Sequence, residues 1–161
     1  MKTFVCKTTQ IILILLVLST IAFAFYQSAL PPEESAEKSD KVGEIIEEII
    51  PPDTKPGEYV QKNLRKLAHF TEFFFLGLWS SLYVMIFARK LGNSLLLLPF
   101  GTIVGLLDET VQIFSKRGSS VTDVWIDSLG YATGLVTVFF VCLVIFIIKH
   151  IVRIRAGRIS L

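Results

Sequence analysis

Five carboxylates lie inside or beside strongly apolar segments of this sequence, although the other nine of its fourteen acidic residues gather in one polar stretch, 31–62. A carboxylate at the centre of a membrane-spanning helix costs roughly 2.5–3.5 kcal/mol. Charged groups in such places usually face one another and mark a functional site. Four more polar residues of the same segments join the five, so we expect one polar site built by several helices. The nine residues are Lys66, His69, Glu72, Asp108, Glu109, Gln112, Arg117, Asp123 and Asp127.

The basic residues of this set suit the binding of an anion. Lys66 and Arg117 can donate charged hydrogen bonds to a phosphate or a carboxylate. The carboxylates of Asp123 and Asp127, together with the Gln112 amide, can position these cations and accept hydrogen bonds from amines or sugar hydroxyls. The first hypothesis is therefore a binding site for an anionic headgroup at the membrane surface.

The acidic residues and the histidine also suit catalysis. His69 is a candidate general acid or base, oriented by Glu72 or Asp108, and Glu109 is a further catalytic candidate. Alternatively, His69 and the carboxylates of Glu72, Asp108 and Asp127 bind a divalent metal, for which Mg²⁺, Mn²⁺ and Ca²⁺ suit such oxygen ligands best. The sequence has no recognisable nucleophile motif and no common zinc spacing. Whether the protein is an enzyme, and whether it holds a metal, stays open.

Two other interpretations apply to the same residues. They can form a polar clamp that holds the helices in register, or they can relay protons in a transporter. A clamp rarely needs nine ionisable or amide groups. The four membrane spans that we expect, given in the next paragraph, are few for a transporter. A functional site therefore remains the favoured interpretation.

The composition is that of a membrane protein. The 161 residues are 52% hydrophobic and have a mean hydropathy of +0.61, which is too apolar for a soluble domain of this size. A net charge of only +2 argues against a nucleic-acid partner. A membrane-spanning helix needs about 20 apolar residues. We expect an all-α integral membrane helical bundle in the lipid bilayer, with four transmembrane helices at 11–30, 64–88, 94–114 and 124–148.

These spans divide the chain into four parts. They are an N-terminal transmembrane anchor (1–30), an acidic extracytoplasmic linker (31–62), a three-helix membrane domain (63–148) and a basic cytoplasmic tail (149–161). Basic residues gather before the first span, in the short turn 89–93 and after the fourth span, and such residues favour the cytoplasm. The sequence therefore predicts a multi-pass membrane protein with both termini in the cytoplasm.

The first span has an alternative interpretation. Ala22-Phe23-Ala24 resembles a signal-peptidase site, so the span can also be a cleaved signal peptide. The apolar run continues past these residues, which favours an uncleaved anchor.

The acidic linker contains one amphipathic pattern. Val42, Ile45, Ile46, Ile49 and Ile50 recur at helical spacing and predict a helix over 42–50, stopped by two prolines. The following stretch, 51–58, has the composition of a loop. Such a helix can lie on the bilayer surface, lie over the polar site, or remain marginal within a flexible linker.

Small residues accompany the carboxylates on the last two spans. Gly101 and Gly105 precede Asp108, whereas Gly130 and Gly134 follow Asp127, each pair at the spacing that lets helices approach closely. On the second span, Lys66, His69 and Glu72 cover a stripe about 120° wide. The antiparallel topology brings these polar ends to one membrane surface. Thr122 is the expected N-cap of the last span.

Three ordered motifs together resemble one family of bacterial membrane proteins, the VanZ-like family. The resemblance covers roughly 60–140, and at position 127 this chain has Asp where many members have Asn. The motifs are Lys66-x-x-His69-x-x-Glu72, Asp108-Glu109-x-x-Gln112-x-Phe114-x-x-Arg117 and Asp123-Val124-x-x-Asp127-x-x-Gly130-x-x-x-Gly134.

The resemblance implies a role at the cell surface. The founding member is associated with resistance to the glycopeptide teicoplanin and does not use the altered-precursor route of its cluster neighbours. By resemblance, this protein lowers susceptibility to lipoglycopeptides by binding or altering a cell-surface lipid or wall precursor, or by binding the antibiotic. The alternative is a membrane-interface enzyme acting on a lipid-linked phosphate or sugar. Membership alone does not make this chain a resistance factor.

Overall fold

The computed structural model describes residues 2–87 and 91–159, and these residues form helices joined by short loops. The all-α prediction is confirmed, because no strand occurs in the described part of the chain. The helices are α1 (Lys2–Ala29), α2 (Pro32–Glu47), α3 (Lys55–Phe87), α4 (Leu91–Phe114) and α5 (Val121–Ile159).

Three of these helices are long and apolar enough to cross a membrane. Their candidate spans are Lys7–Ala29, Lys55–Phe87 and Val121–Ile154. Helix α4 coincides with the predicted third span, yet it is not one of the three found among the described residues. Four transmembrane helices therefore remain a prediction, whereas a membrane protein with at least three apolar helices is supported.

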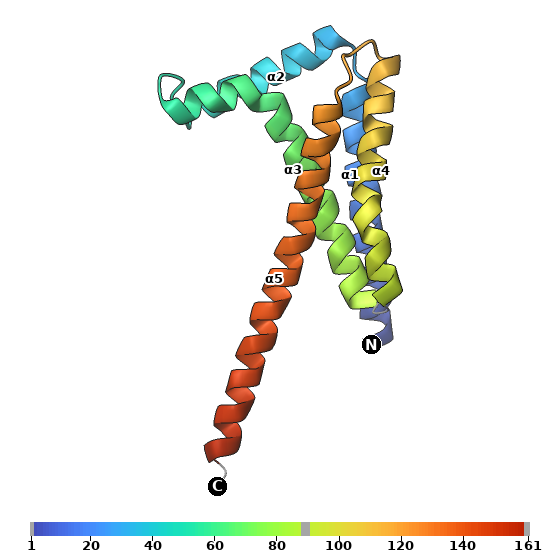
Figure 1. The fold of residues 1–161 in the computed structure, drawn as a ribbon, viewed down its shortest axis with the longest axis vertical. Helices are drawn as coiled ribbons and strands as arrows, with labels where there is room; N and C mark the ends of the chain where they lie inside the picture. The colour runs from blue at the N-terminus through green and yellow to red at the C-terminus, as the bar shows by residue number, and fades with distance from the viewer. Residues whose placement is uncertain (1, 88–90, 160–161) are drawn as a thin grey trace.

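The long helices alternate in direction. Figure 1 shows α1 and α4 side by side, with α3 crossing between them and α5, and α1 begins at the same end of the molecule where α5 ends. Helix α2 and the first turns of α3 lie across the opposite end, which we call the α2 end. The loop between α4 and α5 also lies at the α2 end, so the predicted polar ends do meet at one surface.

Helix α2 differs from the predicted amphipathic helix. It begins ten residues earlier, at Pro32, and ends at Glu47 instead of residue 50. A proline at the first helical position and acidic residues in the first turn both favour this earlier start. Ile49 and Ile50 lie beyond the helix, where their amide groups donate to the Ile46 carbonyl in a closing turn.

The predicted loop 51–58 is only half correct, because α3 already begins at Lys55. Thr54 caps this start: its Oγ1 accepts from the Gly57 amide at 3.2 Å, and its carbonyl accepts from the Glu58 amide at 2.9 Å. Because Thr54 caps the helix, α3 can begin soon after Pro51 and Pro52.

Three further boundaries were predicted incorrectly. Leu91, Gly92 and Asn93 are helical, and the rest of the expected turn lies outside the described residues. Ser120, not Thr122, caps α5, because the Ser120 Oγ accepts from the Thr122 amide at 3.1 Å. Helix α5 also continues through most of the predicted tail to Ile159, since the basic side chains after 149 are good helix formers.

Glycines set the spacing between α3 and α5. A Cβ added at Gly130 would collide with the Phe70 carbonyl oxygen, and one added at Gly134 would collide with the Phe74 carbonyl oxygen. The predicted small-residue face of α5 is therefore the contact face with α3. Beside it lies the buried cluster of Phe73, Leu76, Val104 and Tyr131, which joins α3, α4 and α5.

Candidate functional site

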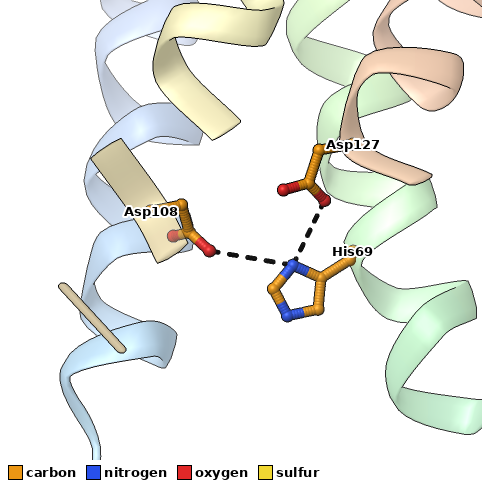
Figure 2. A group of neighbouring side chains, drawn as sticks. All are labelled: His69, Asp108 and Asp127. Atoms are coloured by element: carbon orange, nitrogen blue, oxygen red, sulfur yellow. Dashed lines mark ion pairs between the residues drawn. The ribbon is translucent and has the colours of Figure 1, made fainter. Parts of the chain in front are cut away.

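One histidine and two aspartates from three helices form the buried centre of the site. His69 of α3 points its Nδ1 toward the Asp127 Oδ1 of α5 at 3.3 Å and the Asp108 Oδ2 of α4 at 3.8 Å (Figure 2). Both aspartates are fully buried, and His69 is 7% exposed. Gly105 makes the approach possible, because an added Cβ there would lie only 3.2 Å from the Asp127 side chain. We call these three residues the His–Asp–Asp group.

This group can hold a metal ion. One ligand atom from each residue lies within 4.8 Å of the others. Apart from the ion-pair contacts of the His69 Nδ1, this atom, the Asp108 Oδ1 and both Asp127 carboxylate oxygens form no hydrogen bond, although all are buried. Buried polar atoms without partners cost free energy and call for an explanation such as an ion or water. One neutral imidazole and two carboxylates also balance the charge of a divalent cation.

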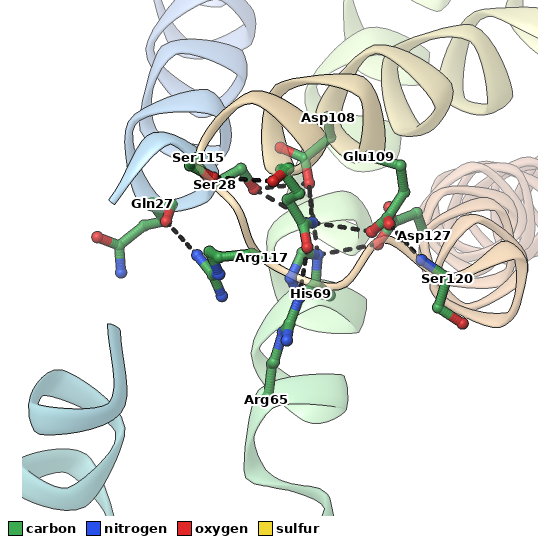
Figure 3. Close-up of polar contacts among 11 residues, drawn as sticks. Gln27, Ser28, Arg65, His69, Asp108, Glu109, Ser115, Arg117, Ser120 and Asp127 are labelled. Atoms are coloured by element: carbon green, nitrogen blue, oxygen red, sulfur yellow. Dashed lines mark hydrogen bonds and ion pairs between the residues drawn. The ribbon is translucent and has the colours of Figure 1, made fainter. Parts of the chain in front are cut away.

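A hydrogen-bond network orients Asp108. Its Oδ2 accepts from the Ser28 Oγ at 2.8 Å and from the Gln112 Nε2 at 3.1 Å (Figure 3). The same Gln112 nitrogen donates to the Glu109 Oε1 at 2.8 Å. Helix α1 therefore contributes a residue to the site, which the sequence interpretation had built from the other three spans alone.

Glu109 ties the α4–α5 loop to the network. Its Oε2 accepts from the Ser120 amide at 2.7 Å, at the start of α5. At the other side of the loop, the Ser115 Oγ donates to the Ser28 carbonyl at 2.8 Å. These contacts give Glu109 a role in positioning the loop, whereas its predicted catalytic role remains untested.

Two arginines lie beside this hydrogen-bond network. Arg65 of α3 donates through Nη2 to the Gln112 Oε1, and Arg117 donates through Nη1 to the Gln27 carbonyl at 2.6 Å. Burial, and then the neighbouring Arg65, lower the pKa of the Arg117 guanidinium from its ordinary value. Adjacent like charges destabilise one another unless an anion lies between them.

The structure brings Arg65, not Lys66, to the site. Lys66 is exposed and forms no ion pair with any described residue. Helical geometry explains the difference, because Arg65 and Glu72 are seven residues apart and point within about 20° of each other, whereas Lys66 and Glu72 differ by about 120°. The i, i+4, i+7 spacing of Arg65, His69 and Glu72 was the sequence signal that the predicted stripe overlooked.

Two predicted acidic residues lie at the edge of the site. Glu72 is half-buried and lines a cavity beside His69, but it is not part of the His–Asp–Asp group. Asp123 is half-buried in the first turn of α5, and among the described residues it forms no ion pair with Lys66 or Arg117, the cations that it was expected to position. The predicted four-residue metal set is thus reduced to three.

A cavity of about 670 Å³ opens between α1, α2 and α3. Its polar end lies at the α2 end and is lined by Arg65, His69, Glu72 and Arg117. Its other walls are mostly apolar, and they include Phe75 and Trp79. Phe23 and Phe75 remain 52% and 42% exposed, so the apolar part of the cavity is open at its side. Residues of α2 line the cavity, and Figure 1 shows this helix lying across the α2 end of the molecule.

Comparison with known proteins gives one match. A family model described as VanZ/LLP1 matches residues 11–147. This range confirms the resemblance found in 60–140 and extends it through α1, α2 and most of α5. No curated protein and no solved structure matches the chain significantly.

Proposed function

Because the chain belongs to the VanZ-like (VanZ/LLP1) family, we propose that it binds a membrane amphiphile with an anionic headgroup, such as a lipid-linked cell-wall precursor. The cavity between α1, α2 and α3 is the binding site. The observation that carries the proposal is the division of this one cavity into a polar end that holds two arginines and an apolar slot, which matches the shape and chemistry of a lipid.

The headgroup lies at the two arginines. Arg65 and Arg117 each use one donor within the protein and keep others for a ligand, and the Arg65 Nε is buried without a partner. Arginine forks match phosphate oxygens in pairs, and an anion between the two guanidinium groups removes their mutual repulsion. Lys38 of α2 lines the same cavity and adds a third cation.

The hydrocarbon tail lies along α1 and α3. From Gln27 down to Leu16, the cavity follows a twelve-residue stretch of α1, or about 16 Å of helix. This length is close to half of the roughly 30 Å hydrocarbon core of a bilayer. Exposed Phe23 and Phe75 leave a side opening through which a lipid of one leaflet can enter. Because the basic residues favour cytoplasmic termini, that leaflet is the outer one.

Binding at this position accounts for a role in lipoglycopeptide defence. A lipid-linked precursor held by the protein, or altered in its headgroup, presents less target to an antibiotic that acts on the outer leaflet. The resemblance to a family whose founding member is associated with teicoplanin resistance supports this role.

Expression of the chain in a glycopeptide-sensitive Gram-positive host is expected to raise tolerance of teicoplanin but not of vancomycin. Asp108→Ala and Arg117→Ala are expected to abolish the rise, because they remove the network and one headgroup cation. Lys41→Ala, which breaks only an exposed ion pair on α2, is the control. All variants are first shown to reach the membrane. If a host that expresses the unmodified chain tolerates no more teicoplanin than the same host without it, resistance is not the role of this family member.

A second candidate function is metal-assisted chemistry on a lipid-linked phosphate or sugar. The His–Asp–Asp group favours it, because its buried unpartnered oxygens fit a divalent cation. A bound ion there would supply Lewis-acid activation, while Arg65 and Arg117 bind and orient the phosphate. His69, Asp108 and Asp127 would hold the ion, and Ser28 and Gln112 would orient the Asp108 carboxylate.

Metal analysis of the purified protein is expected to find about one divalent ion per chain. Asp127→Asn and His69→Ala are expected to lose it, because each removes one of three ligands. Glu72→Gln is the control, since Glu72 lies beside the group without belonging to it. A wild-type protein without stoichiometric metal after purification free of chelators would leave only metal-free chemistry at His69.

A further inference from the structure

A second, smaller cavity adjoins the first. It has a volume of about 310 Å³ and shares four lining residues with the larger cavity, namely Ser35, Ser39, Arg65 and Arg117. The two arginines therefore stand between an apolar slot on one side and a polar opening on the other. A ligand whose anionic group lies between them can extend into both cavities.

The smaller cavity is lined by three basic residues and by no acidic residue. Besides Arg65 and Arg117, it contains Lys116, which is exposed and belongs to the α4–α5 loop. A phosphate monoester carries a charge of about −1.5 to −2, which the two arginines already match. Lys116, which lines only the smaller cavity, is then a cation beyond those that a single phosphate needs, as Lys38 is in the larger cavity.

The backbone at Lys116 adds an independent observation. Lys116 has a φ of 58°, and it is the only residue with positive φ that the described part of the chain contains. The amides of Lys116 and Arg117 donate to the Ile113 and Gln112 carbonyls at 3.2 and 3.0 Å, the pattern of a Schellman motif that ends α4. Glycine is the usual residue at this position because it has no Cβ. A lysine therefore occupies a position whose backbone conformation favours glycine.

We propose that the ligand carries two successive anionic groups, as a lipid-linked diphosphate does, with the first at Arg65 and Arg117 and the second at Lys116. This inference rests on the proposed function, because the first group and the tail occupy the larger cavity. The smaller cavity, with Ser35 and Ser39 on its α2 side, is then the path by which the headgroup leaves toward the aqueous phase.

The test measures the affinity of the purified full-length protein in detergent for farnesyl monophosphate, farnesyl diphosphate and inorganic diphosphate. The two farnesyl probes have the same tail and differ by one phosphate. Wild-type protein is expected to bind farnesyl diphosphate roughly tenfold or more tightly than the monophosphate, since a charged hydrogen bond is worth about that factor. Inorganic diphosphate is expected to bind more weakly, because it leaves the slot empty.

Lys116→Gly is the decisive variant, because glycine suits the backbone there and removes the cation. It is expected to bind both farnesyl probes as wild type binds the monophosphate, with no loss of thermal stability. Lys116→Asn is expected to behave in the same way, because asparagine also tolerates positive φ. Lys66→Ala is the control variant and is expected to keep the preference for farnesyl diphosphate.

Equal affinity of wild type for the two farnesyl probes, or an unchanged preference in both Lys116 variants, overturns the diphosphate inference and leaves lipid binding intact. If neither farnesyl probe binds, the proposed function itself is overturned. Inorganic diphosphate that binds as tightly as farnesyl diphosphate identifies a free anion, not a lipid, as the ligand.

Discussion

Arg65→Gln is expected to weaken the binding of an anionic lipid such as farnesyl monophosphate by roughly tenfold to a hundredfold. Arg65 contributes a guanidinium to the cationic end of the cavity, and its buried Nε has no partner within the protein. Glutamine removes the charge and keeps a polar group near the position of the arginine Nε, but it ends two bonds short of the Nη2 atom that donates to Gln112. Affinity measured by isothermal titration on the detergent-solubilised protein checks the result.

Lys66→Gln is the matched control for this prediction. It removes the same charge one residue further along the same helix, where the side chain is exposed and unpaired among the described residues. The two variants therefore separate a local effect of position from a general effect of net charge. Weaker binding in Lys66→Gln with normal binding in Arg65→Gln would contradict the arrangement of α3 and restore the first interpretation of the sequence.

Gly130→Ala is expected to lower the thermal stability of the protein strongly. The added methyl group would collide with the Phe70 carbonyl, which cannot rotate away as a flexible side chain can. Overpacking of this kind typically costs 1–3 kcal/mol, or about 3–10 °C in melting temperature for a chain of this size. Thermal unfolding in one detergent, followed by size-exclusion chromatography, measures the change.

Gly118→Ala provides the comparison for this change. The same methyl group added at Gly118 meets no atom within 4 Å, so its melting temperature is expected to match that of wild type. If Gly130→Ala is equally stable, α3 and α5 are not in the close contact described. Because that contact sets the distance between His69 and Asp127, Gly130→Ala is also expected to disturb the His–Asp–Asp group.

The sequence was sufficient for the class of protein and for four side chains that meet at the centre of the candidate site. Apolar runs of about 20 residues can satisfy their backbone groups in a bilayer only as helices, so length and composition predicted an all-α membrane protein. The cost of a buried charge then marked the carboxylates as a group. His69, Asp108, Gln112 and Asp127 do meet, since the helices run antiparallel and their polar ends share one surface.

Only the tertiary structure decided which other side chains, such as Arg65 and Ser28, join the buried carboxylates in the site. The 3.6-residue period places residues on the faces of one helix, but it does not give the rotation of that helix against its neighbours. Glycine contacts set that rotation between α3 and α5, and they turn Arg65 toward Gln112 while Lys66 stays exposed. Ser28 could not be assigned for the same reason, although its polar side chain near the end of an apolar helix was a signal.

The cavity could not be predicted from the sequence either. It arises because α2 crosses the end of the bundle while α1 and α3 diverge beneath it (Figure 1). The direction of α2 depends on turns at its two ends and on contacts such as Lys38 with Gln27, which join residues eleven positions apart. Local periodicity determined the helices and their polar faces, whereas the space between them depends on contacts between segments far apart in the chain.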